Sequence, residues 1–118
     1  MLTQSKYITA IVEKLKPTNP YAVILFGSCA TNEATENSDI DLIVVSSETT
    51  EPKNYTEKLD LQYRVSNLLY EIALQTPIDL IVFTLPMYRK FLEQNSSFAK
   101  EIKTKGKILY EANNGAVA

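Results

Sequence analysis

The stretch AVILFGS at residues 22–28, followed after a gap of ten residues by DID at residues 39–41, decides the fold of this chain. Residues 22–26 are apolar and β-prone, which predicts a buried strand that ends at Gly27. A short helix predicted over residues 28–34 would offer free N-terminal amides to phosphate oxygens. The stretch therefore predicts a phosphate-binding turn at the end of a buried strand.

Asp39 and Asp41 lie two positions apart at the start of a second predicted strand, residues 40–45. Side chains alternate between the two faces of a strand, so both carboxylates should share one face while Ile40 and Leu42 occupy the other. Two adjacent carboxylates repel each other unless a cation neutralises them. Mg²⁺ prefers carboxylate oxygens supplemented by water and substrate phosphates, so the pair predicts a site for two Mg²⁺ ions.

A third carboxylate, Asp79, lies near the start of another predicted buried strand, residues 78–84. An aspartate at the start of a strand is, in isolation, most often a solvated residue at the edge of a sheet. If this strand lies beside the strand of Asp39 and Asp41, the three acids converge. The role of Asp79 therefore depends on the order of the strands.

The remaining periodic segments predict helices around these strands. The predicted helices cover residues 3–16, a long segment that opens at Asn54 and includes Ile72, residues 87–94 and residues 98–105. This order predicts an α/β fold with a small mixed β-sheet flanked by helices. We expect one domain at residues 1–112 and a disordered tail at residues 113–118.

The composition limits the chemistry that the chain can perform. With 118 residues, 45% of them apolar, it is long enough for one domain with a real core. Its net charge of −2 gives no general reason to bind nucleic acid. The absence of histidine excludes Ser-His-Asp and Cys-His catalysis and histidine zinc sites. Two-metal phosphoryl transfer, which runs on carboxylates, is the common mechanism that remains.

The sequence also predicts where the protein works. Its one cysteine, Cys29, cannot form an internal disulfide, which suits a reducing cytosol. The first residues are polar, unlike a signal peptide, and no apolar run approaches the length of a membrane span. We therefore expect a cytoplasmic protein with no membrane contact.

GSCA at residues 27–30, together with SDIDL at residues 38–42, resembles the signature of the minimal nucleotidyltransferases. These are small stand-alone members of the polymerase-β-like nucleotidyltransferase superfamily, and the resemblance covers about residues 21–111. It implies the polymerase-β-like nucleotidyltransferase fold and a Mg²⁺-dependent transfer that uses ATP.

The resemblance also implies a role for each candidate site residue. Asp39 and Asp41 would hold both metal ions, and Asp79 would bind one of them and help deprotonate the attacking hydroxyl. Gly27 and Ser28 would cradle the β- and γ-phosphates of the incoming nucleotide.

Three functions are compatible with this resemblance. Minimal nucleotidyltransferases typically pair with a small helical HEPN-domain protein, often an RNA-cleaving toxin. The chain would then be an antitoxin that moves AMP from ATP to a tyrosine of that toxin. The first alternative is a non-catalytic antitoxin that neutralises its partner by contact. The second is a transferase acting on a small molecule such as an aminoglycoside.

One position departs from the family pattern. Many relatives carry Arg-Gly after the Gly-Ser-x-Ala segment, where this chain has Thr31 and Asn32. The missing arginine removes a charge that could steady a triphosphate. This departure predicts slow turnover or reliance on basic residues of a partner.

Overall fold

The computed structural model describes residues 5–31, 33–34 and 38–112. The helices are α1 (Ser5–Leu15), α2 (Tyr55–Leu68), α3 (Tyr70–Ala73), α4 (Leu85–Glu93) and α5 (Ser97–Lys105), with short 3₁₀ helices η1 (Lys16–Thr18) and η2 (Gly27–Cys29). The strands are β1 (Ala22–Phe26), β2 (Ile40–Val45), β3 (Ile78–Phe83) and β4 (Lys107–Glu111). The tail predicted at residues 113–118 lies outside the described residues, and so does Asn32.

The four strands form one mixed sheet in the order β3-β2-β1-β4. β1 runs antiparallel to β2 and to β4, whereas β2 and β3 run parallel. A crossover through α2 and α3 makes the parallel pairing possible, because parallel neighbours need a connection that returns the chain to the same end. The predicted α/β fold with a small mixed sheet flanked by helices is confirmed.

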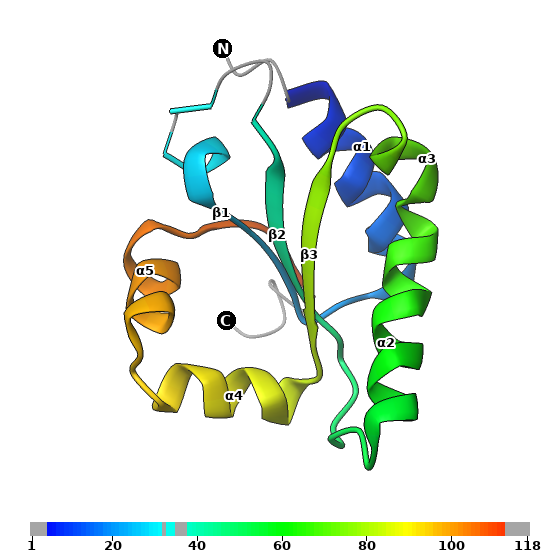
Figure 1. Ribbon diagram of the computed structural model, residues 1–118, viewed down its shortest axis with the longest axis vertical. Coiled ribbons are helices and arrows are strands. Elements are labelled where there is room, and N and C mark those ends of the chain that lie inside the picture. The colour runs from blue at the N-terminus through cyan, green and yellow to red at the C-terminus, as the bar shows by residue number, and fades with distance from the viewer. Residues whose placement is uncertain (1–4, 32, 35–37, 113–118) are drawn as a thin grey trace.

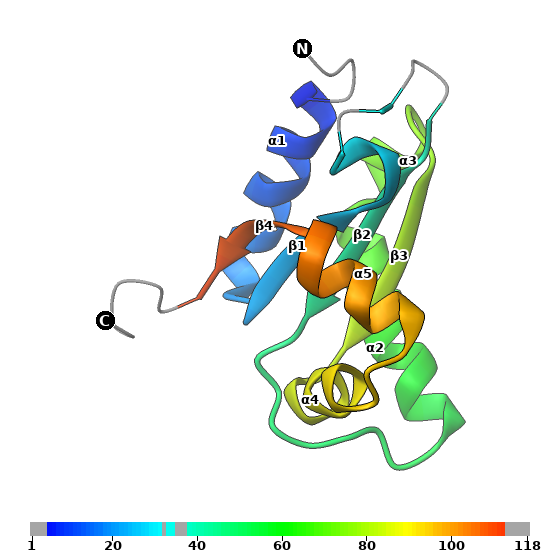
Figure 2. The ribbon, with the colours of Figure 1, turned by 90° about the vertical axis from the view of Figure 1, so that its left-hand side faces the viewer.

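Helices cover both faces of the sheet. Figure 1 shows α1, α2 and α3 on one side and α5 on the other, and Figure 2 shows α5 crossing in front of the strands. Because side chains alternate along a strand, β2 contributes residues to the cores on both faces of the sheet. Ile40, Leu42 and Val44 pack into the core under α1 and α3, and Ile43 and Val45 pack into the core under α4 and α5.

The core under α4 and α5 is rich in aromatic side chains. Phe26 and Phe98 meet edge to face with ring centroids 5.3 Å apart, and Phe91 stands 5.4 Å from Phe98 and 5.1 Å from Phe83. Such contacts add to the free energy gained by burying the rings. They fix α4 and α5 against the face of the sheet that also carries Asp41.

Capping side chains set the start of two helices. Asn54 accepts a hydrogen bond from the amide of Glu57 at 2.9 Å and begins α2, as the sequence predicts. Ser96 accepts from the amide of Ala99 at 3.1 Å and begins α5. Each bond satisfies an amide that the helix leaves without a partner. Gly106 is the C-cap of α5, which ends at Lys105, the end predicted from the sequence.

Three local expectations were wrong. The helix expected over residues 28–34 is only the 3₁₀ helix η2, which ends at Cys29. The long helix that opens at Asn54 is interrupted at Leu69, whose amide bonds to Ser66 in a tighter 3₁₀ turn. The periodicity of this long helix predicts one buried apolar stripe that includes Leu68, but Leu68, which lies beside the break, is 39% exposed.

No helix in the described part of the chain combines the length and the apolar character needed to cross a bilayer. The longest of the described helices, α2, has 14 residues.

Candidate active site

The parallel pairing of β2 with β3 brings two of the predicted acids together. The register places Asp41 directly opposite Asp79. Asp41 shares its face with Ile43 and Val45, which belong to the core under α4 and α5. Asp41 is half-buried, whereas Asp79 is exposed. The strand of Asp79 therefore lies beside the strand of Asp41, which is the condition on which convergence of the acids depends.

Asp39 lies one residue before β2 and is exposed. Its negative charge acts on the Asp41 carboxylate, so the two groups are electrostatic neighbours. Its backbone carbonyl accepts a hydrogen bond from the Cys29 thiol at 3.5 Å. This bond ties the turn after β1 to the segment that leads into β2.

Gly27 lies at the start of the turn, against the side chain of Asp41. Its φ of 71° lies in the left-handed region that side chains disfavour. A Cβ atom at this position would collide with the Oδ2 atom of Asp41. Phe26, the preceding residue, pairs with Asp41 across β1 and β2. Glycine is therefore required here for both its backbone conformation and its lack of a side chain.

The turn after Gly27 is closed by backbone hydrogen bonds. Ala30 donates to the Gly27 carbonyl at 3.1 Å, and Glu33 donates to the Ser28 carbonyl at 3.0 Å. The Thr31 hydroxyl donates to the Glu33 carboxylate. At the position where many relatives carry an arginine, this chain therefore holds a hydroxyl bonded to an acid, which adds negative charge next to the turn.

The electrostatics of the acid pair depart from those of isolated carboxylates. Burial, followed by a hydrogen bond with Asp79 and by the charges of Asp79, Asp39 and Glu101, raises the pKa of Asp41 to about 6. Burial, with the charges of Asp41 and Asp39, also raises the pKa of the Cys29 thiol. The buried thiol is therefore protonated at neutral pH, which favours a packing role over a nucleophilic one.

The carboxylates of Asp39, Asp41 and Asp79 are of the ligand type that binds divalent cations. Carboxylate oxygens are the ligands that Mg²⁺ prefers, and a dication would relieve the repulsion that raises the pKa of Asp41. Asp41 and Asp79 are neighbours, and Asp39 is close enough to act on Asp41. Within the described ranges, no three His, Cys, Asp or Glu side chains stand together as a group that could hold a metal ion. The donors fit in kind, and the metal role of the three acids stays a prediction.

Glu101 is a site residue that sequence reasoning missed. It lies on α5, is exposed, and its charge contributes to the raised pKa of Asp41. No spacing rule could link two residues so far apart in the chain. Only the packing of α5 on the sheet brings this fourth carboxylate toward the others.

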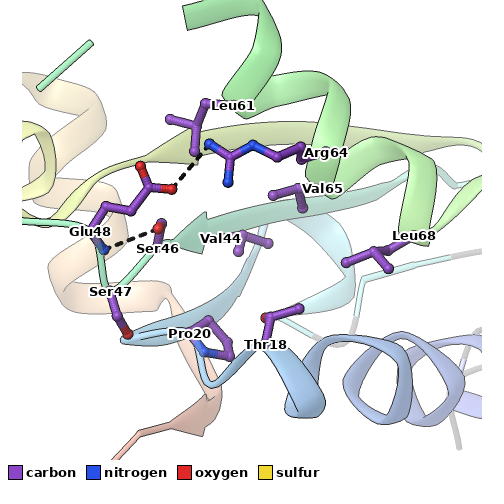
Figure 3. A pocket seen from close by; sticks show the side chains of 10 residues that line it. All are labelled: Thr18, Pro20, Val44, Ser46, Ser47, Glu48, Leu61, Arg64, Val65 and Leu68. Atoms are coloured by element: carbon purple, nitrogen blue, oxygen red, sulfur yellow. Dashed lines mark hydrogen bonds and ion pairs between the residues drawn. The ribbon is translucent and has the colours of Figure 1, made fainter. Parts of the chain in front are cut away.

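A cavity of about 410 Å³ lies at the opposite end of β2 from the acids. Figure 3 shows Leu61, Val65 and Leu68 of α2 facing Val44 and Pro20 across it. Its polar groups are engaged with one another: Arg64 pairs with Glu48 at 3.1 Å, and the Glu48 amide donates to the Ser46 hydroxyl at 3.1 Å. We therefore assign the candidate chemistry to the strand end that carries Asp41 and Asp79, not to this cavity.

The basic residues near the C-terminal end are exposed. They are Lys100, Lys103, Lys105 and Lys107. Their exposure is typical of a solvated face.

Comparisons with known proteins place this geometry in context. A candidate nucleotidyltransferase from Sulfolobus solfataricus has a TM-score of 0.60 at 21% identity, over 92% of this chain and 81% of that one. A toxin–antitoxin structure with AMP-PNP has a TM-score of 0.53 at 20% identity, over 92% and 76% of the two chains. A tri-AMPylated HEPN toxin of Shewanella oneidensis in complex with MNT antitoxin gives 0.50 at 18% identity, over 98% and 78%. At these identities the likeness shows the fold alone.

The same comparisons found no match among curated proteins. The family model of polymerase beta nucleotidyltransferases matches residues 6–115, which is nearly the whole chain. The strand, turn and acid pair described above lie within this match. The chain therefore belongs to the polymerase beta nucleotidyltransferase family.

Proposed function

We propose that this protein is a Mg²⁺-dependent nucleotidyltransferase that moves AMP from ATP to a tyrosine hydroxyl of a HEPN-domain toxin, and so acts as an antitoxin. Membership of the nucleotidyltransferase family supports the reaction class. The structural neighbours that contain AMP-PNP or an AMPylated HEPN toxin support the nucleotide and the acceptor. The observation that carries the proposal is the Asp41–Asp79 pair held against the Gly27 turn.

We assign the roles in this reaction as follows. Asp39, Asp41 and Asp79 would hold the metal ions, and Gly27 and Ser28 would bind the nucleotide phosphates. When bound, Mg²⁺ would neutralise charge on the triphosphate and on the leaving group. The left-handed conformation of Gly27 keeps the turn within reach of the Asp41 carboxylate, so nucleotide and acids share one end of the sheet.

The transfer step follows from these positions. The acceptor hydroxyl oxygen forms a bond to the α-phosphorus, the bond from the α-phosphorus to the bridging oxygen breaks, and pyrophosphate leaves. Asp79 takes the proton of the acceptor hydroxyl. Its exposure supports this role, because a carboxylate at the surface can reach a hydroxyl that another protein presents.

The exposed acids also support a protein acceptor. Asp39 and Asp79 both face solvent beside the half-buried Asp41. A helical partner that docks over this end of the sheet would present its tyrosine and exclude water from the reacting groups. Because ATP and Mg²⁺ are cytosolic, the proposal includes a cytoplasmic setting.

Intact-mass spectrometry of the partner tests the proposal. A candidate HEPN-domain partner is incubated with the purified chain, ATP and Mg²⁺, and with the Asp39→Ala/Asp41→Ala variant as control. We expect the mass of one or more AMP units on the partner with the wild type only. No mass gain with any of the four ribonucleotides would reject protein nucleotidylation and direct attention to a small-molecule acceptor.

A second candidate is neutralisation by contact alone. The Thr31–Glu33 hydrogen bond favours it, because Thr31, at the position where many relatives carry an arginine that could steady the triphosphate, is here bonded to an acid. Neutralisation of toxicity by Asp41→Asn, with no AMP on the toxin, would support the contact mechanism. Loss of neutralisation in a variant that still binds the toxin would support catalysis.

A further inference from the structure

A second cavity, of about 300 Å³, adjoins the one in Figure 3 and shares Glu48, Leu61 and Arg64 with it. Its walls come from the loop between β2 and α2, the first turns of α2 and the residue that precedes α4. Figure 1 shows these segments together at the end of the sheet away from η2. Thr84, in its wall, follows Asp79 by five positions, which is roughly 17 Å along an extended chain. The cavity is therefore distinct from the candidate active site.

Acidic side chains form the rim of this space, which we call the acidic cavity. Glu48, Glu51, Glu57 and Asp60 all line it, and all four are exposed. Arg64 is the one basic side chain among the described residues that line it. The rim therefore carries more negative than positive charge, which attracts cations and repels phosphates.

Each rim carboxylate is held in place through one of its oxygens. Arg64 bonds to two of the carboxylates, and Lys90 of α4 and the amide of Lys53 each bond to one. The bonded oxygens are Oε1 of Glu48, Oε2 of Glu51, Oε1 of Glu57 and Oδ2 of Asp60. The other oxygen of each carboxylate accepts no hydrogen bond from the described residues. Because the two basic side chains neutralise only part of the charge, the rim can still bind a cation.

The floor of the acidic cavity contains a buried hydroxyl group that lacks a partner. Leu61 is 3% exposed and Thr84 is 1% exposed. Thr84 and Met87 are arranged as a capping box around the start of α4, but the Thr84 side chain makes no capping hydrogen bond. Its hydroxyl oxygen has no hydrogen-bond partner anywhere in the described part of the chain. Buried hydroxyls are normally hydrogen-bonded, so this one indicates a ligand group at the floor, independently of the acids.

An ammonium group on an aliphatic chain satisfies both the rim and the floor. It carries a positive charge and three N–H donors, so it can bond to carboxylates and to the Thr84 oxygen. The methylene groups of such a chain would lie against the apolar side chains of Leu61 and Pro52. A water molecule could bond to Thr84 but would leave the charge of the rim unchanged.

The volume and the spread of the acids favour a ligand with several ammonium groups. A volume of about 300 Å³ holds about ten water-sized groups at about 30 Å³ each, which is the size of a short aliphatic triamine. In the described residues, no three acids stand close enough together to hold a metal ion, so separate charges on one chain fit the rim better than a single metal ion. We propose that the acidic cavity binds an aliphatic polyamine, with one ammonium group at Thr84 and the others at the rim carboxylates. The proposal does not rest on the transferase activity, so either can fail without the other.

Calorimetric titration of the full chain with spermidine, in EDTA and at physiological ionic strength, tests the proposal. We expect one spermidine to bind per chain. Glu48→Gln/Asp60→Asn removes two rim charges and should weaken binding by roughly tenfold or more. The matched control is Glu13→Gln/Glu71→Gln, which removes the same charge from exposed acids of α1 and α3 and should bind as the wild type does. No binding by the wild type, or equal binding by the rim variant and the wild type, overturns the proposal.

Thr84 provides a second variant that leaves the charge of the rim intact. Thr84→Val removes the hydroxyl with little change of shape and should weaken spermidine binding several-fold, whereas Thr84→Ser should retain it. Because the hydroxyl has no partner in the chain, Thr84→Val should melt no lower than the wild type without ligand. Equal spermidine binding by Thr84→Val and the wild type removes the hydroxyl from the site and overturns the proposal.

Amide chemical shifts of the wild type locate the bound spermidine without any variant. We expect the largest changes at Thr84, Glu48 and Glu57, and little displacement by an equal concentration of Mg²⁺. Changes centred on Asp41 would place the polyamine at the acids of the candidate active site and overturn the proposal. Full displacement by an equal concentration of Mg²⁺ would show a site for inorganic cations and would also overturn it.

Discussion

Asp41 of β2 and Asp79 of β3 stand opposite each other in a parallel strand pair, and the proximity of Asp79 contributes to the raised pKa of Asp41. The register of the strands places the two residues opposite each other, and the backbone of Gly27 packs against the side chain of Asp41. Burial of Asp41, together with the neighbouring acids, disfavours the charged form of its carboxyl group. The result is a carboxyl group with a pKa of about 6 that a proton or a cation would stabilise.

Replacing Asp41 by Asn should abolish nucleotidyl transfer and raise the stability of the metal-free protein. The amide keeps the shape of the side chain, removes its charge and can donate to Asp79. At pH 8 in EDTA we expect a melting temperature roughly 2–8 °C above that of the wild type. The matched control is Asp60→Asn, an exposed acid paired with Arg64, which should change the melting temperature little. A lower melting temperature for Asp41→Asn would show that the charge itself is structural.

The stability of the metal-free wild type should fall as the pH rises through about 6. The pKa of Asp41 is raised in the folded state from 3.8 to about 6, so folding favours the protonated acid. This contribution is complete below pH 3.8 and is lost as the pH rises through the folded pKa. Solvent screening limits it to about 1–3 kcal/mol.

Chemical denaturation in EDTA from pH 4 to pH 8 measures this loss. The Asp41→Asn variant should lack this component of the pH dependence, and Mg²⁺ should restore stability to the wild type at pH 8. Equal pH profiles for the wild type and the variant would contradict the raised pKa of Asp41.

Replacing Gly27 by Ala adds only one methyl group but should lower both the stability of the protein and its nucleotide binding. The new Cβ would collide with the Asp41 carboxylate, and the φ of 71° is strained for alanine. We expect a loss of stability of about 1–3 kcal/mol and a loss of nucleotide binding. Thermal melting and nucleotide titration measure the two effects. Ser28→Ala is the control next to it, expected to retain stability while binding the nucleotide less tightly. Normal binding by Gly27→Ala would remove the turn from the proposed site.

The local structure around the site could be predicted in large part. The apolar run before Gly27 gave β1, and the alternation of acids with apolar residues gave the two faces of β2. Both follow from period-two patterning, which strand geometry imposes on any buried sheet. The position of Asp79 opposite Asp41 could be stated only as a condition, because strand order is a tertiary property.

The parts that sequence reasoning missed depend on packing. β4, which the sequence does not predict as a strand, is an edge strand, and its Ile108 is 56% exposed, so no buried pattern marks it. Glu101 reaches the acids only because Ile102 and Phe98 bury α5 on the sheet. Helix propensity also could not predict how short η2 is. The backbone at Gly27 packs against the Asp41 side chain, and this contact is a tertiary one.

Introducing an arginine next to the phosphate turn should strengthen nucleotide binding. Thr31→Arg supplies the charge that many relatives carry at this position and removes the hydroxyl that bonds to Glu33. A guanidinium can bind two phosphate oxygens at once, so we expect the Kd for ATP to fall roughly tenfold, about 1.4 kcal/mol. Calorimetric titration with ATP and Mg²⁺ measures the change. The control Thr31→Gln removes the hydroxyl without adding charge and should bind as the wild type does. If both variants bind ATP equally, the arginine of the relatives does not act through the phosphates in this chain.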